Sequence, residues 1–414
     1  VVWYSIIWTY GFYLMGAMYI VGSVLSWILT LYLLFKLWIQ TEDTPEEEKI
    51  QVPIMIWIWI IGMLVMQVAL VIGHLDFELS TGEIIKSSIG WAKGWAALAL
   101  YPLVGVLNIR PQIIYRATCI VCLHTLIISP LLIIAPILRF PEVLYVSPLR
   151  AVGGPSNQFF DVSFYEVDFD GQIRQRLFTP WGPALGFVAS IYFVLILSEK
   201  NTKWRWYGII GSIYLGYICK SRLALVSLLL TPILTTLLSR LSRPFVLMAL
   251  GVVSAIAGAF APAIITLFND IMTKFTEARA ASSRVRRILK EIAGHRWETE
   301  APIWGHGVLE AGPHVVEFMP IGSHHTWFGL LFVRGIVGFY ALAIPMLLSF
   351  FVLVIRSQRH EVARVGLGIL ITLFLYTFGE NLEILAYLYW PGLIVMGIAF
   401  KPAPRNKAVM VTEP

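Results

Sequence analysis

Histidines that could transfer a proton gather in one polar segment of the chain. Five of the eight histidines lie within residues 295–325, namely His295, His306, His314, His324 and His325. Imidazole titrates near physiological pH, so histidine is the side chain best suited to act as a general acid or base. The spacings match no zinc motif and include no cysteine. We therefore favour acid–base chemistry over a metal site and over surface histidines without a role.

Basic side chains near this segment could hold a phosphate. Lys220 and Arg222 lie between two apolar runs in YICKSRLALVS. An arginine at membrane depth is costly unless it reaches the interface or faces an anion, and its planar guanidinium suits a phosphate or diphosphate. Two interpretations of Arg222 stay open, a side chain that snorkels to the interface and a phosphate clamp.

Two further motifs flank these residues. PIWGHG places Gly305 and Gly307 between the arginines and the histidines, and predicts a tight turn or a close approach of backbone to a ligand. TFGENLEIL contains Glu380, which could orient a histidine or pair with an arginine. A solvated loop carboxylate is the alternative for Glu380.

The elements that must position these side chains are membrane helices. The 414 residues are 58% hydrophobic and 14% charged, with a mean hydropathy of +0.75. Soluble domains contain about 25% charged residues, so the composition predicts an all-α polytopic membrane protein with one membrane domain over residues 1–414. The basic residues are scattered among short loops, which disfavours nucleic acid as a partner.

About 20 apolar residues are needed to cross a bilayer as a helix. The apolar runs predict 10–12 spans, at residues 3–39, 52–73, 91–109, 114–138, 181–198, 206–220, 223–239, 245–268, 326–355, 365–378 and 384–400. The first run is too long for one upright helix, so we expect either a short interfacial helix before a span or two shortened spans.

The lysines and arginines of the short loops predict the orientation. Fourteen lie in one set of loops and three in the opposite set; the first set is 40–51, 110–116, 199–206, 240–243, 356–364 and the tail 401–414. This bias predicts a cytoplasmic tail and two long extracytoplasmic loops, 139–180 with a small hairpin and 269–325 with an amphipathic helix over 277–292. Long loops translocate largely regardless of charge, so the seven basic residues of 269–325 do not overturn this topology.

The candidate residues therefore fall on one side of the membrane. Arg222, Glu380 and the loop that carries His324 all belong to the extracytoplasmic set. Basic groups for a departing diphosphate, together with a histidine for a hydroxyl proton, indicate group transfer from a lipid diphosphate. On the helix over 277–292, Arg284 and Arg287 share one face at i, i+3.

Several of these motifs together resemble the superfamily of O-antigen ligases and Wzy-type O-antigen polymerases. The resemblance covers about residues 180–400 and lies in Ser221–Arg222, SSR at 282–284, PIWGHG, SHHTWFGLLFVRGIVGF and GENLEILAYLYWPGLIVMGIA. In that family a histidine precedes a Gly-x-x-Gly pair by eleven and fourteen residues, which fits His324 with Gly335 and Gly338. His325 stands where the family commonly has asparagine, which is a departure.

The resemblance implies a glycosyltransferase-C-like fold and an inverting, metal-independent transfer that needs no cofactor. The donor would be a glycan on undecaprenyl diphosphate, and the acceptor a glycan or a lipid core. His324 would be the general base, Arg222 and Arg284 would hold the diphosphate, and Arg287 is a second candidate for that role. His325, Lys220, Gly305, Gly307 and Glu380 would support the site. The location implied is the bacterial inner membrane, with the site facing the periplasm.

Other functions remain open from the sequence. A transporter or flippase of lipid-linked glycans is the main alternative, although such proteins are expected to carry helix-breaking or charged residues at mid-bilayer in paired halves. A structural subunit of a membrane complex is a third. The sequence does not separate ligase from polymerase, and it leaves open whether a separate chain-length regulator is a partner.

Overall fold

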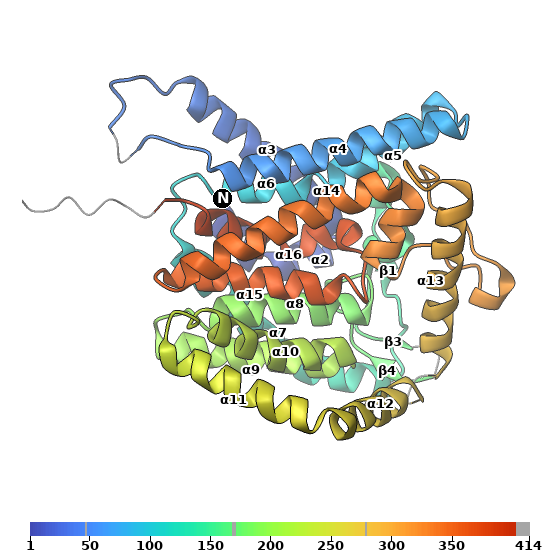
Figure 1. Ribbon diagram of the computed structural model, residues 1–414. Helices are drawn as coiled ribbons and strands as arrows, with labels where there is room; N and C mark the ends of the chain where they lie inside the picture. The colour runs from blue at the N-terminus through green and yellow to red at the C-terminus, as the bar shows by residue number, and fades with distance from the viewer. Residues whose placement is uncertain (46–47, 168–170, 278–279, 403–414) are drawn as a thin grey trace, which may run out of the picture.

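The computed structural model describes residues 1–45, 48–167, 171–277 and 280–402. The described chain is a bundle of long helices that run in roughly the same direction in Figure 1, with a cap of short segments at one end. The helices are α1 (Val2–Ile7), α2 (Thr9–Leu14), α3 (Met18–Trp38), α4 (Ile54–Asp76), α5 (Thr81–Lys93), α6 (Ala97–Val104), α7 (Pro111–Ile137), α8 (Gly182–Ile196), α9 (Thr202–Ile218), α10 (Arg222–Leu238), α11 (Pro244–Ala259), α12 (Ala261–Glu277), α13 (Ala280–Glu300), α14 (Thr326–Ser357), α15 (Glu361–Tyr376) and α16 (Leu382–Ala399).

Five helices are long and apolar enough to cross a membrane, which confirms the membrane class. They are α3, α4, α7, α14 and α16, and the pair α11–α12, bent by 81°, would make a sixth if it counts as one span. The other predicted spans correspond to shorter helices among the described residues, such as α8 with 15 residues and α15 with 16. At 1.5 Å per residue these reach about 22–24 Å, which is less than the ~30 Å hydrocarbon core.

The first apolar run is broken into short and long pieces. The six-residue helices α1 and α2 precede α3, a 21-residue helix. Gly16, between α2 and α3, has a φ of +64°, and a Cβ added there would lie 2.3 Å from the Cβ of Ser147. The chain therefore turns at Gly16, and only α3 continues across the bundle. This arrangement agrees with the expectation of a short helix before a span.

Hydrogen bonds sort the loops into the two sets that the charge pattern predicts. At one end, Arg116 pairs with Glu199 at 2.8 Å, and the Ser242 N–H donates to Gln358 Oε1 at 3.1 Å. The Lys401 ammonium donates to the Leu107 carbonyl at the same end. In Figure 1 the loop between α3 and α4 leaves the bundle at this end.

The opposite end carries the two long loops and α5. Two small antiparallel sheets form in residues 139–180; β1 (Tyr145–Val146) pairs with β2 (Asp161–Val162), and β3 (Glu166–Val167) pairs with β4 (Ile173–Arg174). The β3–β4 pair is the small hairpin expected from the sequence. In Figure 1 α13 stands across this end, beside the strands.

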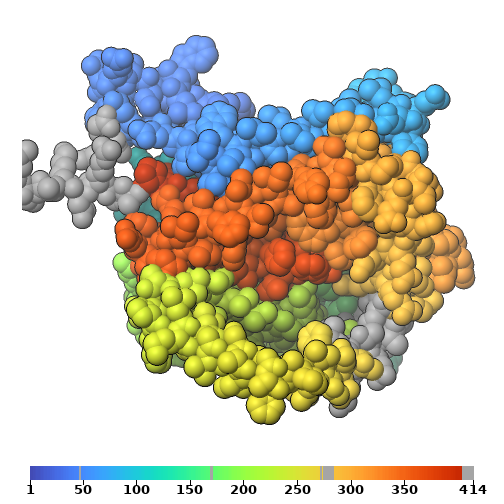
Figure 2. Space-filling model, viewed as in Figure 1, coloured from blue at the N-terminus to red at the C-terminus, as the bar shows by residue number. Residues whose placement is uncertain are grey.

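An apolar stripe holds α13 against the bundle. Val285, Leu289 and Ala293 recur at every fourth residue and pack with Phe332 of α14 and Val316 of the following loop. The helix extends to Glu300, beyond the expected end at residue 292, and residues 278–279 lie outside the described part of the chain. Figure 2 shows that α13 and the loop after it cover this end of the molecule.

Candidate functional site

A buried carboxylate lies at the centre of the capped end. Glu380, in the turn between α15 and α16, is 2% exposed, and its Oε2 accepts a hydrogen bond from Trp181 Nε1 at 2.9 Å. Arg286 of α13 places Nη2 3.8 Å from Glu380 Oε1 and donates from Nη1 to the Gly379 carbonyl at 3.2 Å. Burial raises the pKa of Glu380, whereas Arg286, Trp181 and Arg174 oppose the rise. Glu380 therefore fixes a guanidinium at the turn.

His324 lies beside this pair, two residues before α14. Its Nε2 is 3.3 Å from Met319 Sδ. A thioether sulfur accepts hydrogen bonds but donates none, so the contact favours a proton on Nε2 and leaves Nδ1 as an acceptor. Burial, and to a smaller extent the charge of Arg286, lowers the pKa of His324 to about 4. The imidazole is therefore neutral at pH 7, which is the state that a general base needs.

His325 has a different environment from its neighbour. It is the N-cap residue of α14, and its ring packs edge-on against Phe328 and Phe378, with centroids 5.1 and 5.7 Å away. Its Nδ1 is buried without a hydrogen-bond partner among the described residues. Burial and the nearby charge of Lys290 lower the pKa of His325 to about 4. The contacts of His325 are therefore mainly aromatic.

Arg222 begins α10 at the same end of the bundle. Lys220, just before it, has a left-handed φ of 49° and an exposed side chain. Leu223 follows Arg222 and packs on Gly379, where an added Cβ would lie 2.9 Å from Leu223 Cδ2 and 3.7 Å from Arg286 Nη1. The start of α10 thus reaches the turn that Arg286 contacts.

Arg284 and Arg287, the two arginines of α13 that the sequence analysis selects, do not contact Glu380. Arg284 is exposed, and its Nη1 is 3.5 Å from the Val315 carbonyl. The side chain of Arg287 is 71% exposed and pairs with Glu291 at 3.8 Å. Each helical residue turns the side chain by about 100°, so neighbouring arginines point in different directions. The arginine that meets the buried carboxylate is Arg286.

Gly305 and Gly307 bring the backbone of their loop close to neighbouring helices. Gly335, inside α14, has non-helical angles of φ 61° and ψ −163°. Backbone hydrogen bonds of 2.8–3.3 Å join residues 302–307 to residues 332–337 across this break. A Cβ added at Gly305, where φ is +71°, would lie 2.4 Å from the backbone nitrogen of residue 334. Gly305 therefore approaches α14, whereas a Cβ added at Gly307 would lie 2.8 Å from His74 Nδ1 of α4.

The remaining histidines of the segment do not join His324. His306 is 1% exposed; its Nε2 is 2.8 Å from Glu300 Oε2, and its ring stacks on Phe332 at 4.3 Å. His295 and His314 are exposed. His306 is thus part of the packing that fixes the loop, and the five histidines of the sequence segment do not form one cluster.

A cavity of about 770 Å³ borders the start of α14, and neither His324 nor Glu380 lines it. It is lined by α5, residues 152–155 and 307–309, α14 and the start of α16. Arg334 faces it and is only 4% exposed. Sequence reasoning missed Arg334, although a charge inside an apolar span is itself a signal of function. It also missed Arg286, Trp181 and Arg174, whose positions depend on tertiary contacts.

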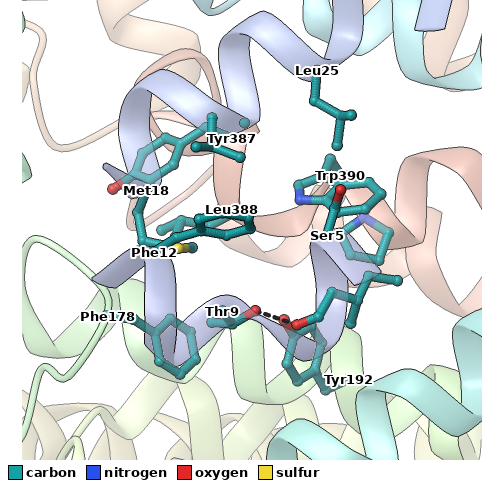
Figure 3. Close-up of a pocket in the computed structure, with 14 residues that line it drawn as sticks. Ser5, Thr9, Phe12, Met18, Leu25, Phe178, Tyr192, Tyr387, Leu388 and Trp390 are labelled. Atoms are coloured by element: carbon teal, nitrogen blue, oxygen red, sulfur yellow. Dashed lines mark hydrogen bonds between the residues drawn. The ribbon is translucent and has the colours of Figure 1, made fainter. Parts of the chain in front are cut away.

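A second cavity lies in the apolar core. Figure 3 shows Phe12, Met18, Phe178, Leu388 and Trp390 around it. Its volume of about 10 Å³ holds no more than about one water molecule. This cavity is a packing defect and not a ligand site.

Within the described residues, no group of three or more His, Cys, Asp or Glu side chains is arranged to hold a metal ion. At the turn between α15 and α16, Arg286 contacts Glu380, and the charge of Arg286 acts on His324. No protein-family model matches the chain, and no curated protein matches it significantly.

Proposed function

We propose that the protein is an inverting, metal-independent glycosyltransferase of the glycosyltransferase-C-like type. It moves a glycan from undecaprenyl diphosphate to an acceptor hydroxyl, as an O-antigen ligase or a polysaccharide polymerase does. The proposed location is the bacterial inner membrane, with the capped end facing the periplasm and residues 401–414 in the cytoplasm. The acceptor is a glycan or a lipid core.

The observation that carries the proposal is the neighbourhood of a neutral histidine and a fixed arginine. His324 has an acceptor nitrogen for a hydroxyl proton. Arg286 is held by Glu380, and its side chain remains 39% exposed, so donors are left for an anion. Arg222 starts α10, whose next residue, Leu223, packs against this turn at Gly379. A base next to cations at the ends of apolar helices suits transfer from a lipid diphosphate.

In the proposed reaction the acceptor oxygen attacks the anomeric carbon from the face opposite the diphosphate. The new C–O bond forms as the bond to the diphosphate oxygen breaks, and the hydroxyl proton passes to Nδ1 of His324. The electron pair of the broken bond leaves with the undecaprenyl diphosphate. Arg286 and Arg222 stabilise the charge that develops on the leaving group.

The surface offers room for the lipid of the donor. Figure 2 shows a hollow between the orange-red helices α14 and α15 and the yellow helices α11 and α12. Apolar side chains of α10 and α11 are exposed, among them Leu229, Ile233, Met248 and Val252. A polyprenyl chain along this hollow would bring its diphosphate to the start of α10.

The test is transfer by purified protein in lipid nanodiscs that contain an undecaprenyl-diphosphate oligosaccharide. We expect release of undecaprenyl diphosphate and a glycan on a new acceptor, with no loss of rate in a chelator. A longer lipid-linked chain identifies a polymerase, and a glycan on a lipid core identifies a ligase. The proposal fails if the donor is moved across the bilayer unchanged, as by a transporter, or if no acceptor receives the glycan although the protein is folded.

A further inference from the structure

The cavity beside Arg334 has the size of a ligand site. Its volume of about 770 Å³ falls within the ~300–1,000 Å³ typical of sites for small ligands. Its walls come from α5, α14, α16 and two loops that are far apart in the sequence. The cavity is therefore a product of the tertiary fold and not of one local turn.

The side chain of Arg334 is placed in this cavity by the break in α14. Its Nε and Nη1 are buried and have no hydrogen-bond partner among the described residues. Gly338, one turn later, makes room for it, because a Cβ there would lie 2.1 Å from Arg334 Cβ. A buried guanidinium with unmet donors is unfavourable unless an anion or another acceptor meets it.

The charges that line the cavity favour an anion. Lys86 and Lys93 join Arg334, against Glu83 and Glu383. Three cations thus face two carboxylates. The charge of Glu383 acts on Arg334, but Nε and Nη1 of Arg334 have no hydrogen-bond partner among the described residues, so these donors remain for a ligand. A planar fork of this kind binds a carboxylate through two parallel hydrogen bonds.

The cavity adjoins the chain segments that carry the candidate site, although His324 and Glu380 do not themselves line it. Gly322 and Thr326 line it, and they flank His324 in the sequence. Asn381 lines it as well and follows Glu380. A glycan that binds in the cavity would extend toward the base.

We propose that this cavity binds an acidic sugar residue of the glycan, with the carboxylate on the guanidinium of Arg334. The inference rests on the proposed function, and it names acidic glycans as the substrate class. The sugar belongs either to the donor or to the acceptor, because both must bring their reacting groups to His324.

Calorimetric titration of the full chain in nanodiscs tests this, with trigalacturonate and neutral trigalactose as probes. We expect the wild type to bind the acidic trisaccharide at least about tenfold more tightly. Arg334→Gln should lose this preference. The control Arg359→Gln removes the same charge from an exposed position at the opposite end of the bundle, and should keep it.

A second pair of variants tests the cavity without altering Arg334. Gly90 of α5 lines the cavity, and a Cβ there meets nothing within 4 Å. Gly90→Phe should fill the space and abolish binding of trigalacturonate, whereas Gly90→Ala should retain it. Equal binding of the two probes by the wild type overturns the proposal, as does an acidic preference that survives in Arg334→Gln or Gly90→Phe. The readout needs no turnover, so a failed transfer assay would contradict the proposed function and leave this result standing.

To separate donor from acceptor, trigalacturonate is titrated in the presence of a saturating undecaprenyl-diphosphate glycan that bears a uronic acid. Displacement of trigalacturonate by this intact donor assigns the acidic residue to the donor. Binding of trigalacturonate to the donor-saturated protein assigns it to the acceptor.

Discussion

The Arg286 guanidinium lies 3.8 Å from the carboxylate of Glu380, across the interface between α13 and the α15–α16 turn. The carboxylate is 3% exposed and the guanidinium 39% exposed, so the pair has a buried side and an open side. The buried carboxylate positions the cation, and the open side leaves nitrogen donors for a ligand. This pair therefore links α13 to the turn between α15 and α16.

Replacement of Arg286 should therefore affect transfer far more than replacement of its neighbour. Arg286→Gln removes the cation that would stabilise the departing diphosphate, and we expect kcat to fall by about 10²–10³. Arg287→Gln alters a side chain that is 71% exposed, and should cost no more than about threefold. Initial rates of undecaprenyl diphosphate release measure both. Equal losses in the two variants would assign the diphosphate to another face of α13.

The pH dependence of the reaction should report the same contact. Burial and the charge of Arg286 hold the pKa of His324 at about 4, and a general base acts only when deprotonated. In the wild type kcat/KM should therefore fall only as the pH approaches about 4. Arg286→Gln removes one of the two causes, so the pKa of His324 rises and activity is lost at a higher pH. The pKa of His324 in this variant should still lie below the usual value near 6.5, because burial, the larger cause of the shift, remains.

Rate profiles from pH 4 to 8 measure this shift, with Arg359→Gln as a control for loss of a distant positive charge. The lowered pKa of His324 also makes the folding stability depend on pH, and stability, like activity, falls at acidic pH. A histidine with a lowered folded pKa contributes stability above pH 6.5, and that contribution is lost as the pH falls toward 4. If kcat/KM falls at the same acidic pH in the wild type and in Arg286→Gln, the charge of Arg286 does not lower the pKa of His324.

Periodicity and charge predict the broad architecture of this chain because they are local properties. The apolar runs give the helices, and the lysines and arginines of the short loops sort those loops into two ends. The number of residues in each helix depends on packing, so α8 (Gly182–Ile196) is shorter than its apolar run, 181–198, whereas α15 (Glu361–Tyr376) begins before its run, 365–378. Within α13 the sequence gives three arginines in four positions, and only the contact with Glu380 distinguishes Arg286. Gly305 illustrates another limit. Glycine in its motif predicts a turn, but the residues that it contacts, 333–335 of α14, come much later in the sequence.

The break in α14 makes a prediction about stability. A Cβ at Gly335 would lie 2.1 Å from the Ile303 carbonyl oxygen, at a φ of +61°. Gly335→Ala therefore combines backbone strain with overpacking, and should lower the free energy of unfolding by about 2–5 kcal/mol. Gly251→Ala is the control, because nothing lies within 4 Å of its added Cβ, and it should raise helix stability slightly. Thermal unfolding in detergent compares the two. Similar melting temperatures would mean that the loop does not occupy the break.

A buried ion pair in the loop 139–180 gives an independent test of the cap. Arg176 Nη2 lies 2.8 Å from Asp161 Oδ1, and each side chain is 5% exposed. Arg176→Ala leaves a buried, unpaired carboxylate and should cost about 3–5 kcal/mol of stability. Replacing both residues, as Arg176→Met with Asp161→Leu, should recover much of that loss. Arg150→Ala, at an exposed position in the same loop, should change the stability by less than about 0.5 kcal/mol. No recovery in the double variant would show that the pair has further partners.

The two adjacent histidines give the most direct test of the proposed chemistry. His324 has a nitrogen free to accept a proton, whereas His325 packs between Phe328 and Phe378. His324→Ala should lower kcat by about 10²–10⁴ without weakening the binding of undecaprenyl diphosphate, because a base acts on the acceptor proton. His325→Phe preserves an aromatic ring in the same packing and should retain most of the activity. Single-turnover transfer, with donor binding measured in parallel, separates the two effects. If His325→Phe abolishes transfer and His324→Ala does not, the base is the second histidine, and the proton passes to a ring held by aromatic contacts.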